Sequence, residues 1–154
     1  MATLRQIVSN RFVLLGLRLV IGGIFIWASV FKIAEPGEFA KSIYNYRMMP
    51  DAAINLMAIV MPWLELICGV LLIIGPGLRG SALLIGCMLL VFIVAISSAI
   101  ARGLDIDCGC FKVGDGGRIV GLKTLIEDVL MLVGVGIILA FGGPSFSLKR
   151  LRRD

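Results

Sequence analysis

The chain has 154 residues, of which 59% are hydrophobic and only 16% are charged. Soluble domains have about a quarter of their residues charged, so this composition excludes an ordinary soluble protein. The net charge of +5 arises from basic residues spread along most of the chain, which argues against a nucleic-acid partner.

Four apolar stretches are each long enough to cross a bilayer, which takes roughly 20 residues. In chain order, the predicted spans cover residues 12–32, 53–75, 79–101 and 121–142. Arg18 interrupts the first stretch and Glu65 the second, whereas the third carries no charge after Arg79. Because open strands and irregular loops cannot face lipid, we expect an all-α membrane protein: a four-transmembrane-helix bundle, with residues 1–154 forming a single domain.

Two long connections, residues 33–51 and 103–120, follow the first and third predicted spans. They fall on the same side of the membrane, and we expect them to form a small cap over the bundle. The turn at Gly75-Pro76-Gly77 is short, so the second and third spans should be antiparallel neighbours. Basic residues usually mark the cytoplasmic side. Those near both ends therefore predict cytoplasmic termini and an outer cap: Arg5, Arg11, Lys149, Arg150, Arg152 and Arg153.

The second long connection contains Cys108-Gly109-Cys110. A disulfide between these cysteines closes a very small ring, and strain makes such a bond easier to reduce. The pair can be a redox-active dithiol, a permanent structural disulfide or two packed thiols. A metal site is disfavoured, because the chain contains no histidine and no second pair of ligands.

Two further cysteines, Cys68 and Cys87, lie within the second and third predicted spans. Their positions along antiparallel helices put them at a similar depth, where they could form an electron relay. The alternative, which the residues favour, is that each packs as a small apolar side chain.

Charged residues inside membrane spans are costly and therefore candidates for function. Arg18 and Lys32 share one stripe of the first span, and Glu65 lies in the second. We expect Lys32 and Glu65 to form an ion pair in the outer half of the bundle, where Glu127 and Asp128 also belong. This pair either fixes the helix register or forms a proton-handling site beneath the dithiol.

Three segments carry a family resemblance: the run from Arg18 to Pro50, the motif Pro62-Trp63-Leu64-Glu65, and Asp107-Cys108-Gly109-Cys110-Phe111. They resemble the DoxX-like membrane proteins, and within them the branch that contains the methylamine utilisation protein MauE. The resemblance implies a four-helix protein of the bacterial inner membrane with its Cys-x-Cys on the periplasmic side. It also implies a partner with a thioredoxin-like fold, and related branches are associated with quinone-linked sulfur oxidation and redox homeostasis.

The main functional hypothesis is a membrane thiol–disulfide oxidoreductase. Cys108 and Cys110 would exchange electrons with the partner, and Glu65 and Lys32 would tune protonation. The predicted docking residues are Tyr46, Arg47 and Phe111. If a quinone is the cofactor, Trp27 or Trp63 could stack on its ring. The alternative hypothesis is a non-catalytic assembly or chaperone subunit in which the disulfide is structural.

Overall fold

The structure is a computed structural model that describes residues 10–109 and 119–142. These residues form five helices and no strand beyond an isolated bridge: α2 (Arg11–Ala34), α3 (Pro36–Asn45), α4 (Asp51–Ile74), α5 (Leu78–Ala101) and α6 (Leu122–Phe141). Four of the helices, α2, α4, α5 and α6, are long and apolar enough to cross a membrane. The prediction of an all-α, four-helix membrane bundle is confirmed.

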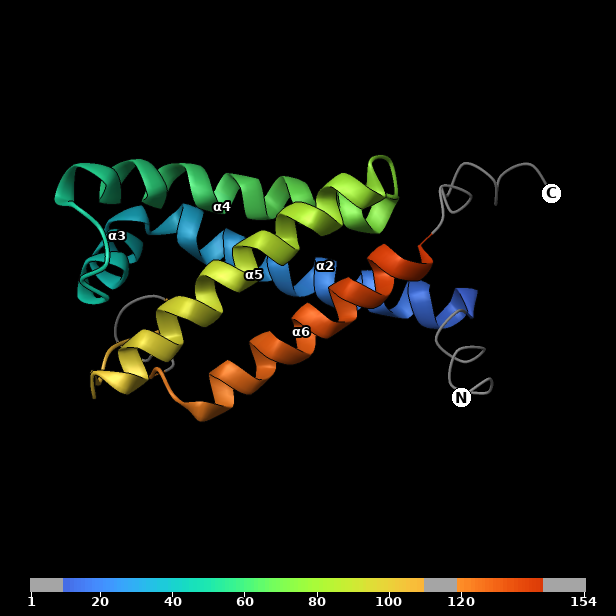
Figure 1. Ribbon diagram of the computed structural model, residues 1–154. Helices are drawn as coiled ribbons and strands as arrows, with labels where there is room; N and C mark the ends of the chain where they lie inside the picture. The colour runs from blue at the N-terminus through green and yellow to red at the C-terminus, as the bar shows by residue number, and fades with distance from the viewer. Residues whose placement is uncertain (1–9, 110–118, 143–154) are drawn as a thin grey trace.

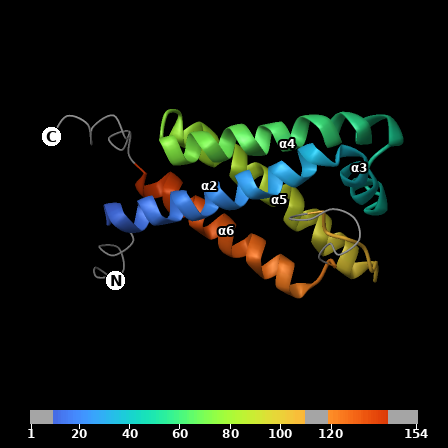
Figure 2. The ribbon, with the colours of Figure 1, turned by 180° about the vertical axis from the view of Figure 1, so that it is seen from behind.

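The four long helices form two antiparallel pairs, α2 with α4 and α5 with α6 (Figure 1). The start of α2, the α4–α5 turn and the end of α6 lie at one end of the bundle, and α3 lies at the other (Figure 2). From their shared turn, α4 and α5 diverge toward the α3 end. Leu72, Ile85 and Val135, from three different helices, belong to the core that joins the pairs.

The α4–α5 turn depends on two glycines. Gly75 ends α4 with φ 100° and donates its N–H to the Leu71 carbonyl at 2.8 Å, and Gly77 precedes α5 with φ 69°. Only glycine adopts such left-handed conformations without steric cost. The turn reverses the chain within three residues, as the sequence predicts.

A close contact between two glycines joins α2 to α4. A Cβ atom at Gly22 would lie 2.8 Å from the Gly69 carbonyl oxygen, and one at Gly69 would lie 2.9 Å from the Gly22 carbonyl oxygen. Backbones this close exclude any side chain, which is how small residues bring membrane helices together. The absence of a side chain at both glycines therefore allows α2 and α4 to pack closely where the two helices cross.

The first long connection contains a helix that the sequence analysis did not predict. Pro36 occupies the first turn of α3, where its missing N–H costs nothing. Phe39 and Ser42 are buried on one face of α3, whereas Lys41 and Tyr44 are exposed on the other. The second connection is closed at its base by an antiparallel bridge between Asp107 and Ile119. Both connections lie at the same end of the bundle.

Candidate functional site

Cys108 lies just beyond α5 and is disulfide-bonded. Its side chain is only 1% exposed and packs with Ile96, Ala99 and Val120. Cys110 and Phe111, the other predicted site residues of this connection, lie outside the described residues. The first half of the Cys-x-Cys motif is thus a buried sulfur near the end of α5 and the start of α6.

Tyr46, at the end of the first long connection, is hydrogen-bonded to the second. Its hydroxyl donates a hydrogen bond to the Cys108 carbonyl at 3.0 Å, and the Arg102 guanidinium donates one to the Tyr46 carbonyl at 2.5 Å. Burial raises the pKa of Tyr46 above its ordinary value, as do the nearby charges of Asp128 and Asp107. The phenol therefore stays protonated and remains a donor. Tyr46 is buried and cannot belong to an exposed docking surface, whereas Arg47 is exposed.

Gly109 holds the Cys-x-Cys segment against α3. It adopts φ 65°, and a Cβ atom there would lie 3.1 Å from the Cβ atom of Ser42 and 3.6 Å from the Phe39 ring. Glycine is required both by the left-handed backbone and by the closeness of α3. The unpredicted helix α3 is therefore part of the site.

The expected Lys32–Glu65 ion pair is present and buried beside Phe39 of α3. Lys32 Nζ contacts Glu65 Oε1 at 2.8 Å and Oε2 at 2.9 Å. The same ammonium lies 4.9 Å from the centroid of the Phe39 ring and 5.1 Å from that of Phe92. Two carboxylate oxygens and two aromatic faces thus compensate for the lost hydration of this cation.

Asp128 of α6 completes the buried charged cluster, which we define as Lys32, Glu65 and Asp128. The three side chains line one small cavity of about 40 Å³, together with Phe92. Asp128 is 5% exposed, and its Oδ2 atom has no hydrogen-bond partner among residues 10–109 and 119–142. A cavity needs only about 10–15 Å³ to hold a water molecule. The cluster therefore has space for water and an acceptor atom ready for a proton.

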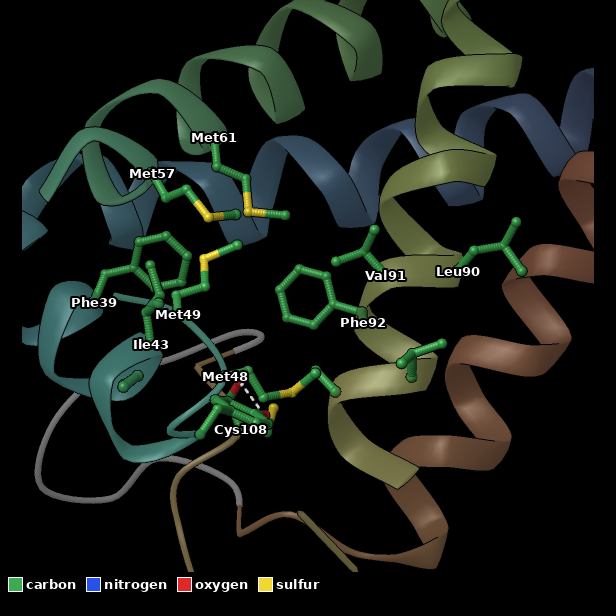
Figure 3. A pocket seen from close by; sticks show the side chains of 14 residues that line it. Phe39, Ile43, Met48, Met49, Met57, Met61, Leu90, Val91, Phe92 and Cys108 are labelled. Atoms are coloured by element: carbon green, nitrogen blue, oxygen red, sulfur yellow. Dashed lines mark hydrogen bonds between the residues drawn. The ribbon is translucent and has the colours of Figure 1, made fainter. Parts of the chain in front are cut away.

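A larger cavity of about 320 Å³ lies between α3, α4 and α5, with Cys108 in its wall (Figure 3). Its lining is almost wholly apolar and includes four methionines: Phe39, Ser42, Ile43, Tyr46, Met48, Met49, Met57, Met61, Leu90, Val91, Phe92, Val94, Ala95 and Cys108. We call this space the methionine cavity. The sequence does not predict this cavity, and the only available signal is the grouping of methionines at 48, 49, 57 and 61.

The remaining predicted residues lie apart from this site. Cys68 is buried in the core, whereas Cys87 is exposed on α5, and both are free thiols. A relay between them stays a prediction. Trp27 and Trp63 are 62% and 52% exposed and line neither cavity described above.

Arg18 lies at the opposite end of the bundle from α3. Its guanidinium donates hydrogen bonds to the carbonyls of Leu72 at 2.8 Å and Ile73 at 3.1 Å, in the last turn of α4. A cation there satisfies carbonyls that lack helical partners and matches the helix dipole. Arg18 thus caps α4 and takes no part in the candidate site.

Together, the fold and the site define a multi-pass membrane protein with a disulfide at one end of its bundle and a buried charged cluster among its helices. The chain belongs to the family of the methylamine utilisation protein MauE, whose family model matches residues 10–141. It is 32% identical to "Methylamine utilization protein MauE" of Paracoccus denitrificans over 86% of this chain and 71% of that protein.

A second relative, the protein of the same name from Methylorubrum extorquens, is 36% identical over 96% of this chain and 74% of its own length. The Paracoccus versutus protein is 33% identical over 86% of this chain and 72% of its own length. No solved structure matches the chain.

Proposed function

We propose that this chain is a membrane thiol–disulfide oxidoreductase, in which Cys108 and Cys110 exchange electrons with a periplasmic partner of thioredoxin-like fold. The observation that carries the proposal is the disulfide-bonded Cys108, held by Tyr46 at the end of the bundle that also contains the buried charged cluster. The names of the relatives support a role in methylamine utilisation. The proposal includes an inner-membrane location, cytoplasmic termini and a periplasmic cap, and the wider likeness to DoxX-like proteins stays a prediction.

The burial of Cys108 gives the two sulfurs different roles within this proposal. A partner thiolate cannot reach a sulfur that is 1% exposed, so it attacks Cys110. The S–S bond breaks, Cys108 leaves as a thiolate, and a mixed disulfide joins Cys110 to the partner. The second thiol of the partner then displaces Cys110. The partner leaves with a disulfide, and the membrane dithiol holds two electrons and two protons.

The buried charged cluster supplies the proton handling that this exchange requires. Lys32 and Glu65 neutralise each other through two contacts, which leaves Asp128 Oδ2 as the acceptor without a partner in the described part of the chain. These residues act through water and Tyr46 and do not touch the sulfurs, so we propose them as positioning and proton-handling residues. Arg47 and Phe111 stay as predicted docking residues.

Single serine variants test the proposal with a purified thioredoxin-like domain as the probe, in which the second cysteine is replaced by serine and the attacking cysteine carries a thionitrobenzoate leaving group. The free Cys110 thiolate of Cys108→Ser should displace thionitrobenzoate and accumulate a mixed disulfide that is stable on non-reducing gels, because neither protein keeps a second thiol to release it. Cys110→Ser keeps only the buried sulfur and should form little adduct. Absence of adduct in both variants would overturn the proposal.

The alternative is an assembly or chaperone subunit with a structural disulfide, and the near-complete burial of Cys108 is the observation that favours it. The reduction potential of the bond separates the two. Catalytic exchange proteins lie between about −120 and −270 mV, whereas structural disulfides lie below about −300 mV. The structural reading also predicts that the double serine variant loses stability.

A further inference from the structure

Four of the seven methionines of the chain line the methionine cavity, and three of them point toward one another. Met57 and Met61 are four residues apart on α4 and therefore share one face of that helix. Met49, just before α4, points its thioether toward them from the α3 side (Figure 3). The fold thus brings three thioether sulfurs to one part of a single cavity.

We propose that Met49, Met57 and Met61 bind a soft monovalent metal ion, copper(I). The proposal is independent of the proposed thiol–disulfide exchange, because thioethers carry it and the Cys-x-Cys sulfurs take no part. Its geometric basis is the convergence of the three methionines in one cavity of about 320 Å³.

The donor set decides which class of metal ion fits. Soft thioether ligands select copper(I), whereas magnesium and calcium need several oxygen ligands. The two hydroxyls of the wall are already engaged, since Ser42 donates to the Glu38 carbonyl and Tyr46 donates to the Cys108 carbonyl. Among residues 10–109 and 119–142, no group of three or more His, Cys, Asp or Glu side chains is placed to hold a metal. Thioethers are therefore the donors that this cavity offers.

The surroundings of the cavity compensate for the charge of the ion, which three neutral ligands would leave at +1. Aromatic ring faces attract cations, and Phe39 and Phe92 both line the cavity. Phe92 also lines the small cavity of the buried charged cluster, which therefore lies next to the proposed site. Lys32 is neutralised there by its two contacts with Glu65, so the carboxylate of Asp128 is the remaining charge. The neighbouring cluster thus favours a cation in the methionine cavity.

The site also has an entrance. Met48 and Met49 lie in the segment between α3 and α4, and they are 47% and 40% exposed while they line the cavity. Met57 and Met61 are only half-buried. An ion can therefore pass from the rim thioethers of the α3–α4 segment to the deeper pair on α4.

The experiment replaces the thioether donors with a side chain of similar size. Met57→Leu and Met61→Leu keep the apolar wall but remove a sulfur each. Met88→Leu is the matched control, because Met88 packs against the core from α5 and does not line the cavity.

Free thiols also bind copper(I), so they are removed first. All variants are made with Cys68→Ala and Cys87→Ser, and the disulfide of Cys108 is kept oxidised. The full chain in detergent is titrated without oxygen against the copper(I) complex of bathocuproine disulfonate. The absorbance of that complex reports how much copper the protein withdraws.

We expect one copper(I) per chain, with a shell of sulfur neighbours in X-ray absorption. The affinity should fall at least about 10-fold in Met57→Leu and in Met61→Leu, since even outer partners of metal ligands contribute that much. The double variant should lose more, and Met88→Leu should bind as the unsubstituted methionine protein does. An excess of zinc should not displace the copper.

The proposal is overturned if the chelator keeps all the copper, or if Met57→Leu and Met61→Leu bind it as tightly as Met88→Leu. A shell of nitrogen or oxygen neighbours would overturn it as well, because the ion would then lie elsewhere. None of these results bears on the proposed function, which the serine variants and the thioredoxin-like probe test separately.

Discussion

At the scale of single residues, Gly109 is the position where sequence and geometry are most tightly matched. It has φ 65°, and the Cβ position faces Ser42 of α3. Gly103, at the end of α5, has nearly the same φ of 64° but no atom within 4 Å of its Cβ position. A substitution at Gly103 therefore measures the cost of the left-handed backbone alone, whereas a substitution at Gly109 adds the cost of the clash with Ser42.

Gly109→Ala should destabilise the protein more than Gly103→Ala. A left-handed alanine costs about 1–2 kcal/mol at either site, and only at Gly109 must a neighbouring element also move. The measurement is thermal unfolding of the two variants in the same detergent. Equal losses for both would mean that α3 does not hold the Cys-x-Cys segment.

Residues that carry charge could be predicted, whereas residues defined by their surroundings could not. Lys32 and Glu65 could be paired from the sequence because an ion pair is the natural way to neutralise opposite charges in neighbouring spans, and the structure contains this pair. Tyr46 is predicted from the sequence as a docking residue, but its phenol reaches the Cys108 carbonyl and is buried. Only the fold reveals that the two connections meet through the buried Tyr46 side chain.

At the scale of helices, the pairing of α2 with α4 depends on one face of each. Gly22 and Gly23 are neighbours on α2, but a Cβ atom at Gly22 would lie 2.6 Å from the Ile73 side chain, and one at Gly23 would meet nothing within 4 Å. Of these two glycines, only Gly22 therefore lies on the face of α2 that packs closely against α4.

Gly22→Ala should lower stability by about 1–3 kcal/mol, the usual cost of inserting a methyl group into a packed contact. Gly23→Ala should not lower it, because alanine is favoured over glycine inside helices by about 1 kcal/mol. Comparison of their thermal unfolding with that of the wild-type protein tests this contrast. A loss in Gly23→Ala as large as that in Gly22→Ala would contradict the crossing geometry.

The four long helices could be predicted from the sequence because a long run of apolar residues is enough to indicate each one. Helix α3 was missed because it is short and begins at Pro36, which is typical of a loop as well as of a first helical turn. The burial of Phe39 and Ser42 could not be predicted, because it depends on α4 and Gly109, which pack against this face of α3.

At the scale of the whole molecule, the buried charged cluster links α2, α4 and α6. Asp128 contributes a buried oxygen with no hydrogen-bond partner among the described residues. Such an unpaired oxygen lowers the stability of the fold. Groups of this kind are commonly kept for function. The cavities themselves could not be predicted, because a cavity is a property of packing between distant segments.

Asp128→Asn should therefore keep or raise thermal stability while it slows thiol–disulfide exchange by about 10²-fold, the lower end of the usual contribution of a proton-transfer group. The rate should also lose part of its pH dependence, and Asp128→Glu should restore some activity. Exchange kinetics across pH 5–9 with the thioredoxin-like probe provide the measurement. A variant that is unstable yet exchanges normally would assign Asp128 a purely structural role.

The charges shared between α2 and α4 also bear on how the protein enters the membrane during synthesis. An isolated Lys or Arg within a span is costly to insert, most of all near the centre of the bilayer. Arg18 and Lys32 of α2 both find their acceptors on α4, the next long helix to be made. We therefore expect α2 and α4 to leave the translocation channel as one hairpin with its charges already matched, before α5 and α6 are synthesised.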